Sequence, residues 1–246
     1  MTDVDDLVLV RLTDRKIETS GRELLELERT IGAELPIGYD AFLLRHGDSV
    51  VSGVLHVLPP SEVLDRRSRM HELAERATVP FDVEASMPVA ETTDAGLVVF
   101  DRRDPSRLSF LACDGTVLEV PGASMLELLA WFVASGEPCP ATELAWVVPS
   151  LGMRRREALP GPGSADVEYE EVAESIESLA LHEHMVEYED PEGPSAVFLA
   201  PSIGGLVTVD GRSSPPRIVI EDDPGVGGRA LARVESLVRN YGYRFG

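Results

Sequence analysis

Apolar residues in this chain occur only in short runs that glycine, proline or polar residues interrupt. The longest runs, such as residues 7–10 and 96–100, span a few positions, whereas a helix that crosses a membrane needs about 20. Together with 43% hydrophobic and 26% charged residues, this pattern is typical of a globular protein without a membrane-spanning segment. The length of 246 residues exceeds the usual single-domain size of roughly 100–150, so we expect two domains.

Prolines and glycines gather in the middle of the chain, at residues 137–140 and 159–164. These residues interrupt helices and strand ladders and therefore predict a domain boundary. We expect a first domain over 1–137, a linker over 138–164 and a second domain over 165–246. The apolar stretch 144–148 within this linker predicts that part of it packs on one of the domains.

The first region begins with a strong helix signal. Ser20 and Glu23 have the spacing of a capping box, and Leu24, Leu27 and Ile31 follow at helical spacing, which predicts a helix over about 21–32. A second short helix carries Tyr39, Phe42 and Leu43, and Gly47 is suited to close it in a left-handed conformation.

The remainder of the first region predicts one antiparallel sheet. Residues 49–58 have a β-rich composition, and Pro59-Pro60 introduces a third helix that extends to about Ala77. Turn residues then separate four expected strands at 87–91, 97–101, 108–112 and 116–120. Ser124 caps a closing helix, so the fold class is α+β, with an antiparallel sheet flanked by helices.

The second region predicts a smaller α+β domain. An amphipathic helix with an acidic outer face begins near Tyr169. Four strands are expected at 184–188, 196–200, 206–210 and 217–220, followed by a final helix.

Residues 27–43, with a Leu-Glu helix, a Gly, a Leu-Pro step and a Tyr-x-x-Phe-Leu helix, resemble the opening motif of the SUKH superfamily. Residues 87–90 and 124–132 are similar to its central strand entry and its closing helix, so the resemblance covers about 18–136. The family commonly has Asn-Gly-Gly after the second helix, where this chain has His46-Gly47-Asp48. The resemblance implies a non-enzymatic protein, either a bacterial immunity protein that neutralises a toxin or a regulator of the fungal cell-wall type.

Charge narrows the choice of partners. The chain has 43 acidic and 22 basic residues, for a net charge of -21. Proteins that bind nucleic acid directly need clustered basic residues, so a basic protein is the expected partner. The acidic amino terminus shows no secretory signal, and Cys113 and Cys139 lack metal-ligand spacing. We therefore expect a cytoplasmic protein whose thiols are small buried hydrophobes rather than a disulfide.

Several motifs could carry chemistry, but each has a plainer interpretation. His182-Glu183-His184 offers two metal ligands without a third, and the glycines of residues 225–228 lack the Lys of a phosphate-binding loop. The pairs Asp101 with Asp104 and Glu221 with Asp222 and Asp223 could serve acid–base chemistry, yet such pairs arise by chance in an acidic chain. No nucleophile motif is present, so we expect neither catalysis nor a cofactor or bound metal.

The leading hypothesis is an immunity protein, or antitoxin, that occludes a cognate toxin, possibly a nuclease. The alternative is a regulatory scaffold that binds cellular proteins without inhibiting a toxin, and an enzyme ranks third. Acidity that serves solubility alone remains the plain explanation for any one carboxylate. Two candidate faces for partner binding are Asp48, Asp94, Asp101, Asp104 and Asp114 at loops around the meander, and Glu170, Glu171, Glu174 and Glu177 on the acidic helix.

Overall fold

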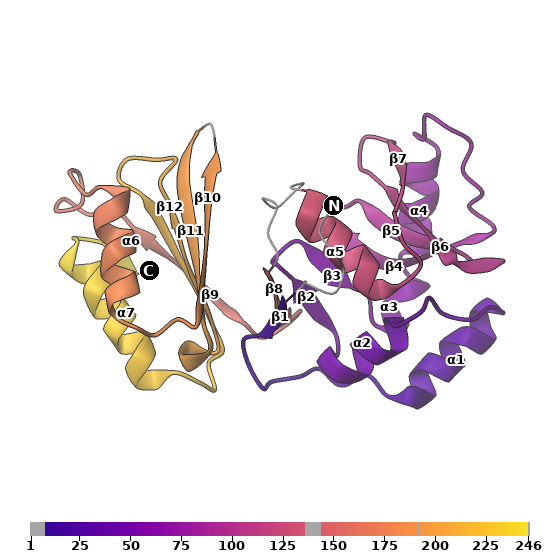
Figure 1. The fold of residues 1–246 in the computed structure, drawn as a ribbon, viewed down its shortest axis with the longest axis horizontal. Coiled ribbons are helices and arrows are strands. Elements are labelled where there is room, and N and C mark those ends of the chain that lie inside the picture. The colour runs from indigo at the N-terminus through magenta and orange to yellow at the C-terminus, as the bar shows by residue number, and fades with distance from the viewer. Residues whose placement is uncertain (1–7, 136–143, 191, 246) are drawn as a thin grey trace. The chain divides into compact units, whose positions relative to one another are not determined.

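A computed structural model describes residues 8–135, 144–190 and 192–245 of the chain. These residues form two compact units. The first lies within Met1–Val10 and Lys16–Leu151, and the second within Arg11–Arg15 and Gly152–Gly246. Each contains one antiparallel sheet with helices (Figure 1), so the α+β class is confirmed. None of the helices in the described ranges is both long and apolar enough to cross a membrane.

The first unit is built on an eight-stranded sheet of order β1-β8-β2-β3-β4-β5-β6-β7. Its strands are β1 (Val8–Arg11), β2 (Ser49–Val51), β3 (Leu55–Val57), β4 (Ser86–Thr92), β5 (Leu97–Asp101), β6 (Asp104–Leu111), β7 (Val117–Glu119) and β8 (Leu144–Pro149). Its helices are α1 (Gly21–Ile31), α2 (Tyr39–His46), α3 (Pro60–Val63), α4 (Arg67–Ala74) and α5 (Met125–Ser135). The strands β4 to β7 pair in sequence order, which confirms the predicted meander.

Helices cover both faces of this sheet. Apolar residues of α1, α2 and α5 form the main core with one face, and α4 packs on the other through Met70 and Leu73. Strand β5 serves both cores, because its side chains alternate: Val98 lies in the main core and Leu97 lies under α4.

The capping residues predicted for α1 and α2 are found at the ends of these helices. Ser20 and Glu23 form the capping box, and Gly32 ends α1 in the left-handed conformation. Gly47 ends α2 with a positive φ of 74° as predicted, although its ψ of -162° lies outside the left-handed helical region. A Cβ atom on Gly47 would lie 2.1 Å from the carbonyl oxygen of Ile17, so this position requires glycine for space as well as for conformation.

The expected single helix from Pro60 to Ala77 is instead two helices, α3 and α4. Val63 of α3 packs into the main core, whereas Met70 and Leu73 of α4 pack into the core on the opposite face of the sheet. One straight helix cannot serve both faces, so the chain turns between Val63 and Arg67.

The second unit has a six-stranded sheet of order β10-β11-β12-β13-β9-β14. Its strands are β9 (Arg154–Leu159), β10 (His184–Asp190), β11 (Gly193–Ala200), β12 (Gly205–Asp210), β13 (Arg217–Asp222) and β14 (Arg244–Phe245). Helices α6 (Tyr169–Ser178) and α7 (Gly228–Asn240) lie on the same side of the sheet (Figure 1) and share one apolar core with it, and a 3-10 turn, η2 (Pro201–Ile203), connects β11 to β12.

The described part of the expected linker over 138–164 contains two strands. Residues 144–149 form β8, an interior strand of the first sheet, and 154–159 form β9 of the second, so the division lies between Leu151 and Gly152. The apolar run does pack on one domain, as predicted. Strand β9 was not predicted because arginines occupy three of its six positions, and their acidic partners on β13 lie 66 to 68 residues further along the chain.

Candidate functional site

The five aspartates expected on one face of the first unit do not share a face. Asp94 lies in the turn between β4 and β5, and Asp114 in the turn between β6 and β7, where the Cys113 thiol is 3.8 Å from the Asp94 carboxylate. Asp101 and Asp104 flank the intervening turn between β5 and β6, at the other end of the strands. Consecutive turns of a meander alternate between the two ends of the sheet, so these acids separate into two groups. Asp48 is buried elsewhere.

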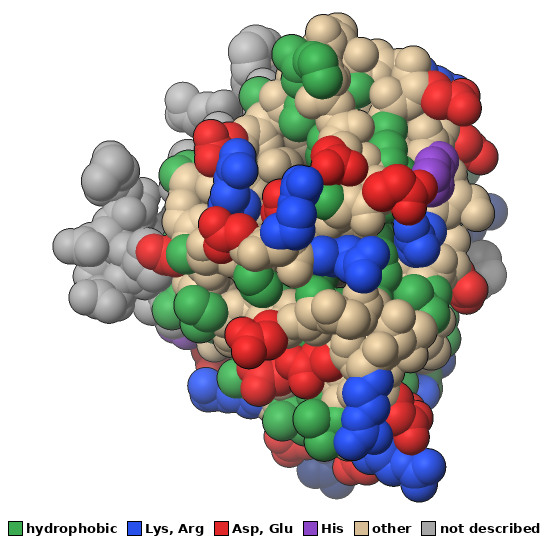
Figure 2. All heavy atoms as spheres, turned by 90° about the vertical axis from the view of Figure 1, so that its right-hand side faces the viewer, with side chains coloured by type: hydrophobic (Ala, Val, Ile, Leu, Met, Phe, Trp, Pro, Cys, Tyr) green, Lys and Arg blue, Asp and Glu red, His purple; other side chains and the backbone are tan. Residues whose placement is uncertain are grey.

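The turn aspartates have structural partners close in sequence. Asp94 accepts a hydrogen bond from the Thr92 hydroxyl, and Asp104 accepts one from Ser106. The Arg103 guanidinium lowers the pKa of Asp101, and the backbone amide of Thr116 lowers that of Asp114. Figure 2, which views the first unit, shows acidic and basic side chains interspersed over much of this face. These acids therefore stabilise turns. Cys113 is exposed, contrary to expectation, and Cys139 lies outside the described residues.

The four glutamates expected on the acidic helix do lie together. Glu170, Glu171, Glu174 and Glu177 are all exposed on α6, while Val172, Ala173 and Ile176 face the core. Helix α6 contains no basic residue. Within the described ranges, none of the four carboxylates takes part in an ion pair. We call these four residues the acidic row.

Asp48 belongs to a polar cluster on the first sheet. Its Oδ1 lies 2.7 Å from Nε2 of His56, and its side chain is only 8% exposed. The β2–β3 hairpin explains this contact: Val50 is opposite His56, so Asp48, two residues earlier, is the diagonal neighbour of His56 on the same face. Burial by itself raises the pKa of Asp48, but the hydrogen bond and charge of His56 act in the opposite direction, and the net effect is a lowered pKa.

Two more carboxylates and an arginine complete this cluster. Glu62 of α3 brings an oxygen to within 4.8 Å of the ligand atoms of Asp48 and His56. Glu91 of β4 is directly opposite His56 in the ladder. Arg66 bridges the two glutamates, at 2.9 Å from Glu62 and 2.6 Å from Glu91. His56 thus lies among three carboxylates, two of which share the guanidinium of Arg66.

Neither His56 nor Glu62 is among the site residues expected from the sequence. His56 is isolated from other potential ligands in the sequence, and only the register of the β2–β3 hairpin places it beside Asp48. Nothing local indicated Glu62, because the chain reverses after Pro59-Pro60 before this side chain meets the sheet.

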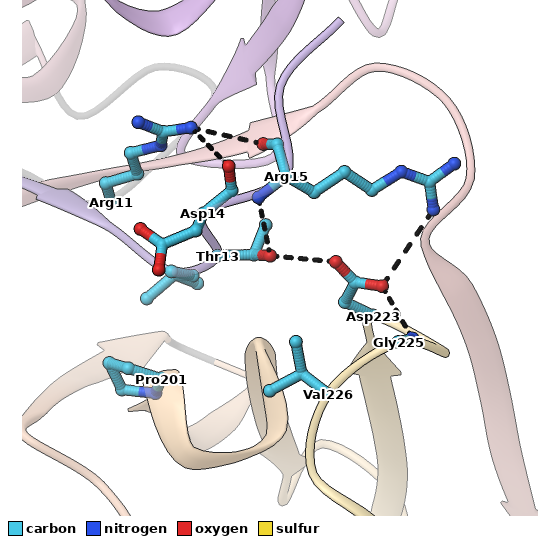
Figure 3. A pocket seen from close by; sticks show the side chains of 9 residues that line it. Arg11, Thr13, Asp14, Arg15, Pro201, Asp223, Gly225 and Val226 are labelled. Atoms are coloured by element: carbon cyan, nitrogen blue, oxygen red, sulfur yellow. Dashed lines mark hydrogen bonds and ion pairs between the residues drawn. The ribbon is translucent and has the colours of Figure 1, made fainter.

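A pocket of about 530 Å³ lies in the second unit (Figure 3). It is lined by Arg11–Arg15 and by Pro201, Asp223, Gly225 and Val226. The carboxylate of Asp223 connects two of the segments that line the pocket. One of its oxygens accepts a hydrogen bond from the Thr13 hydroxyl at 2.8 Å, and the other accepts one from the Gly225 amide at 2.8 Å. The glycine loop before α7 thus donates its hydrogen bond to the Asp223 carboxylate. The negative charge of this carboxylate disfavours a bound anion at the loop.

The other candidate pairs also have structural partners. Glu221 pairs with Arg155 at 3.2 Å, and Asp222 pairs with Arg154 at 2.7 Å. His182 packs edge-on against Phe198 with ring centroids 5.4 Å apart. In the described part of the chain, the one group of three potential metal ligands is that of Asp48, His56 and Glu62.

Comparison with known proteins adds no homologue to this geometry. No family model matches the chain. The searches of curated proteins and of solved structures likewise find no match. The functional assignment therefore depends on the two local features above, the acidic row of α6 and the cluster around His56.

Proposed function

We propose that this chain is a binding protein that captures a basic protein partner through the acidic row of α6. The observation that carries the proposal is the contrast between the two predicted acidic faces. The turn aspartates are bonded to neighbours in their own turns, whereas Glu170, Glu171, Glu174 and Glu177 are exposed and have no basic partner within the described residues.

The acidic row is unfavourable for the isolated helix. Glu174 lies four residues after Glu170, three after Glu171 and three before Glu177, and like charges at these spacings destabilise a helix by about 0.2–0.5 kcal/mol per pair. Only the first-turn glutamates gain from the helix dipole. A basic partner would remove this repulsion, so the row favours association more than it favours folding.

The resemblance of residues 18–136 to the SUKH superfamily supports a specific role. We propose a cytoplasmic immunity protein that neutralises a cognate toxin by occlusion. A toxin that cleaves nucleic acid needs a positive surface for phosphates, and an acidic row can compete for that surface. Complementary charge accelerates encounter, while packing at the interface slows dissociation.

The test is binding kinetics against the product of the adjacent gene, at two salt concentrations. Replacement of Glu171 and Glu174 by lysine is expected to lower the association rate about tenfold at low salt and to weaken its salt dependence. Screening over about 8 Å at physiological ionic strength removes mainly long-range attraction, so dissociation should change less.

The matched control replaces Asp94 and Asp114, two exposed turn acids of the first unit, by lysine. This variant has the same net charge, and its association rate should remain closer to that of the wild type. Equal effects from both variants would indicate steering by net charge alone. Absence of binding to the toxin, with binding to another cellular protein, would favour the regulatory scaffold.

A further inference from the structure

The cluster around His56 has the composition of a metal site. Asp48 and Glu62 offer carboxylate oxygens and His56 offers an imidazole nitrogen, and these atoms lie within 4.8 Å of one another. They come from the loop after α2, from β3 and from α3, so only the fold brings them together. We propose that Asp48, His56 and Glu62 bind one Zn²⁺ ion.

Charge at the cluster favours a cation. The carboxylates of Asp48, Glu62 and Glu91 surround His56, and Arg66 supplies the guanidinium that bridges the two glutamates. These three carboxylates outnumber the single guanidinium, and a divalent ion would balance the excess negative charge.

The ligand types favour zinc among common divalent ions. A mixed nitrogen and oxygen set suits Zn²⁺, which binds both at about 2.0–2.2 Å, whereas Mg²⁺ and Ca²⁺ prefer oxygen alone. At these bond lengths, two ligands of a tetrahedral ion lie about 3.4 Å apart. The 2.7 Å contact between His56 Nε2 and Asp48 Oδ1 must therefore open by less than about 1 Å. The side chains of His56 and Glu62 are 21% and 33% exposed, which leaves an approach for the ion and room for this adjustment.

The surrounding groups can hold the ligands in place. Arg66 bonds Oε2 of Glu62 and Oε2 of Glu91, which leaves Oε1 of Glu62 for the metal. The backbone amide of Ser150 donates a hydrogen bond to the carbonyl oxygen of Asp48 at 3.2 Å. Outer hydrogen bonds of this kind orient metal ligands, and their loss typically weakens metal binding 10–100-fold. Three protein ligands leave a fourth position for water.

The test is calorimetric titration of Zn²⁺ into the full chain after removal of metals with a chelator. We expect one ion per chain for the wild type. The variants His56→Gln and Glu62→Gln should each bind about 100-fold more weakly, because each lacks a direct ligand. The controls are His71→Gln and Glu72→Gln, which alter exposed residues of α4 outside the cluster and should bind as the wild type does.

A second readout is thermal unfolding with and without Zn²⁺. Zinc should raise the melting temperature of the wild type and of the α4 controls, but not of the His56 and Glu62 variants, because binding to the folded state alone stabilises it. Glu62 lies at the surface, so its variant remains informative if the His56 variant does not fold.

Three results would overturn the proposal: a wild type that binds no zinc, a Glu62→Gln or folded His56→Gln variant with unchanged affinity, or loss of binding only when His182 and His184 are replaced. None of these measurements involves the protein partner, so failure of this site and failure of the proposed function are separate outcomes.

Discussion

The carboxylate of Asp222 is fully buried and lies 2.9 Å from the guanidinium of Arg156 on the neighbouring strand. Arg154, directly opposite Asp222 in the β13–β9 ladder, bonds the other carboxylate oxygen at 2.7 Å. Arg156 also pairs with Glu235 of α7. Asp222 thus ties the arginine-rich strand β9 to the middle of the second sheet and, through Arg156, to the final helix.

Replacement of Asp222 by asparagine should lower the free energy of unfolding by about 3 kcal/mol, because removal of one partner leaves the others uncompensated where water is excluded. Urea denaturation of the full chain measures this loss. The control is Glu221→Gln, one residue earlier, whose partner Arg155 is 62% exposed and whose ion pair should contribute less than about 1 kcal/mol. Equal losses at the two positions would contradict a special role for Asp222.

Alanine substitutions at Gly47 and Gly53 would separate two contributions to stability, the cost of a positive φ angle and the cost of a steric clash. Their φ angles are 74° and 71°, but a Cβ atom would lie 2.1 Å from the Ile17 carbonyl oxygen at Gly47 and would meet nothing within 4 Å at Gly53. Gly53→Ala should cost about 1 kcal/mol from conformation alone. Gly47→Ala should cost about 3 kcal/mol or more, because the backbone must also move. Similar losses in a denaturation experiment would show that the contact at Gly47 relaxes freely.

Removal of one charge from the acidic row should stabilise the protein. Glu174→Gln eliminates three repulsive pairs and is expected to raise the free energy of unfolding by about 0.5–1 kcal/mol at low salt. The gain should shrink at high salt, where exposed charges are screened. The control Glu26→Gln on α1 breaks a favourable pair with Arg22 at 2.9 Å and should therefore lower the free energy of unfolding. A destabilised Glu174→Gln variant would mean that the row contributes to folding.

A fragment of residues 1–151 should unfold cooperatively, whereas 1–137 should not. Strand β8 lies between β1 and β2, and its residues Ala145 and Val147 are part of the main core. Its loss exposes an interior edge of the sheet and part of that core. Thermal unfolding followed by circular dichroism compares the two fragments. A cooperative transition in 1–137 with the stability of the longer fragment would restore the boundary expected from the sequence.

Some of the structure could be predicted because its causes are local. The capping box of Ser20 and Glu23, the positive φ of Gly47 and the turns of the meander each depend on residues within a few positions of one another. The acidic row was predictable for the same reason, because helical periodicity alone places Glu170, Glu171, Glu174 and Glu177 away from the core-facing residues of α6.

What the sequence by itself determined is therefore the class of fold, most of the elements and the outward face of α6. Only the tertiary structure decided that Arg154–Leu159 is a strand, because acids of β13 and α7 compensate its arginines. It also decided that the five aspartates divide between the ends of a sheet, and that Asp48, His56 and Glu62 meet. The physical reason is common to all three: strand register and chain reversal bring together residues that lie apart in the sequence, and burial then depends on partners that no local pattern identifies.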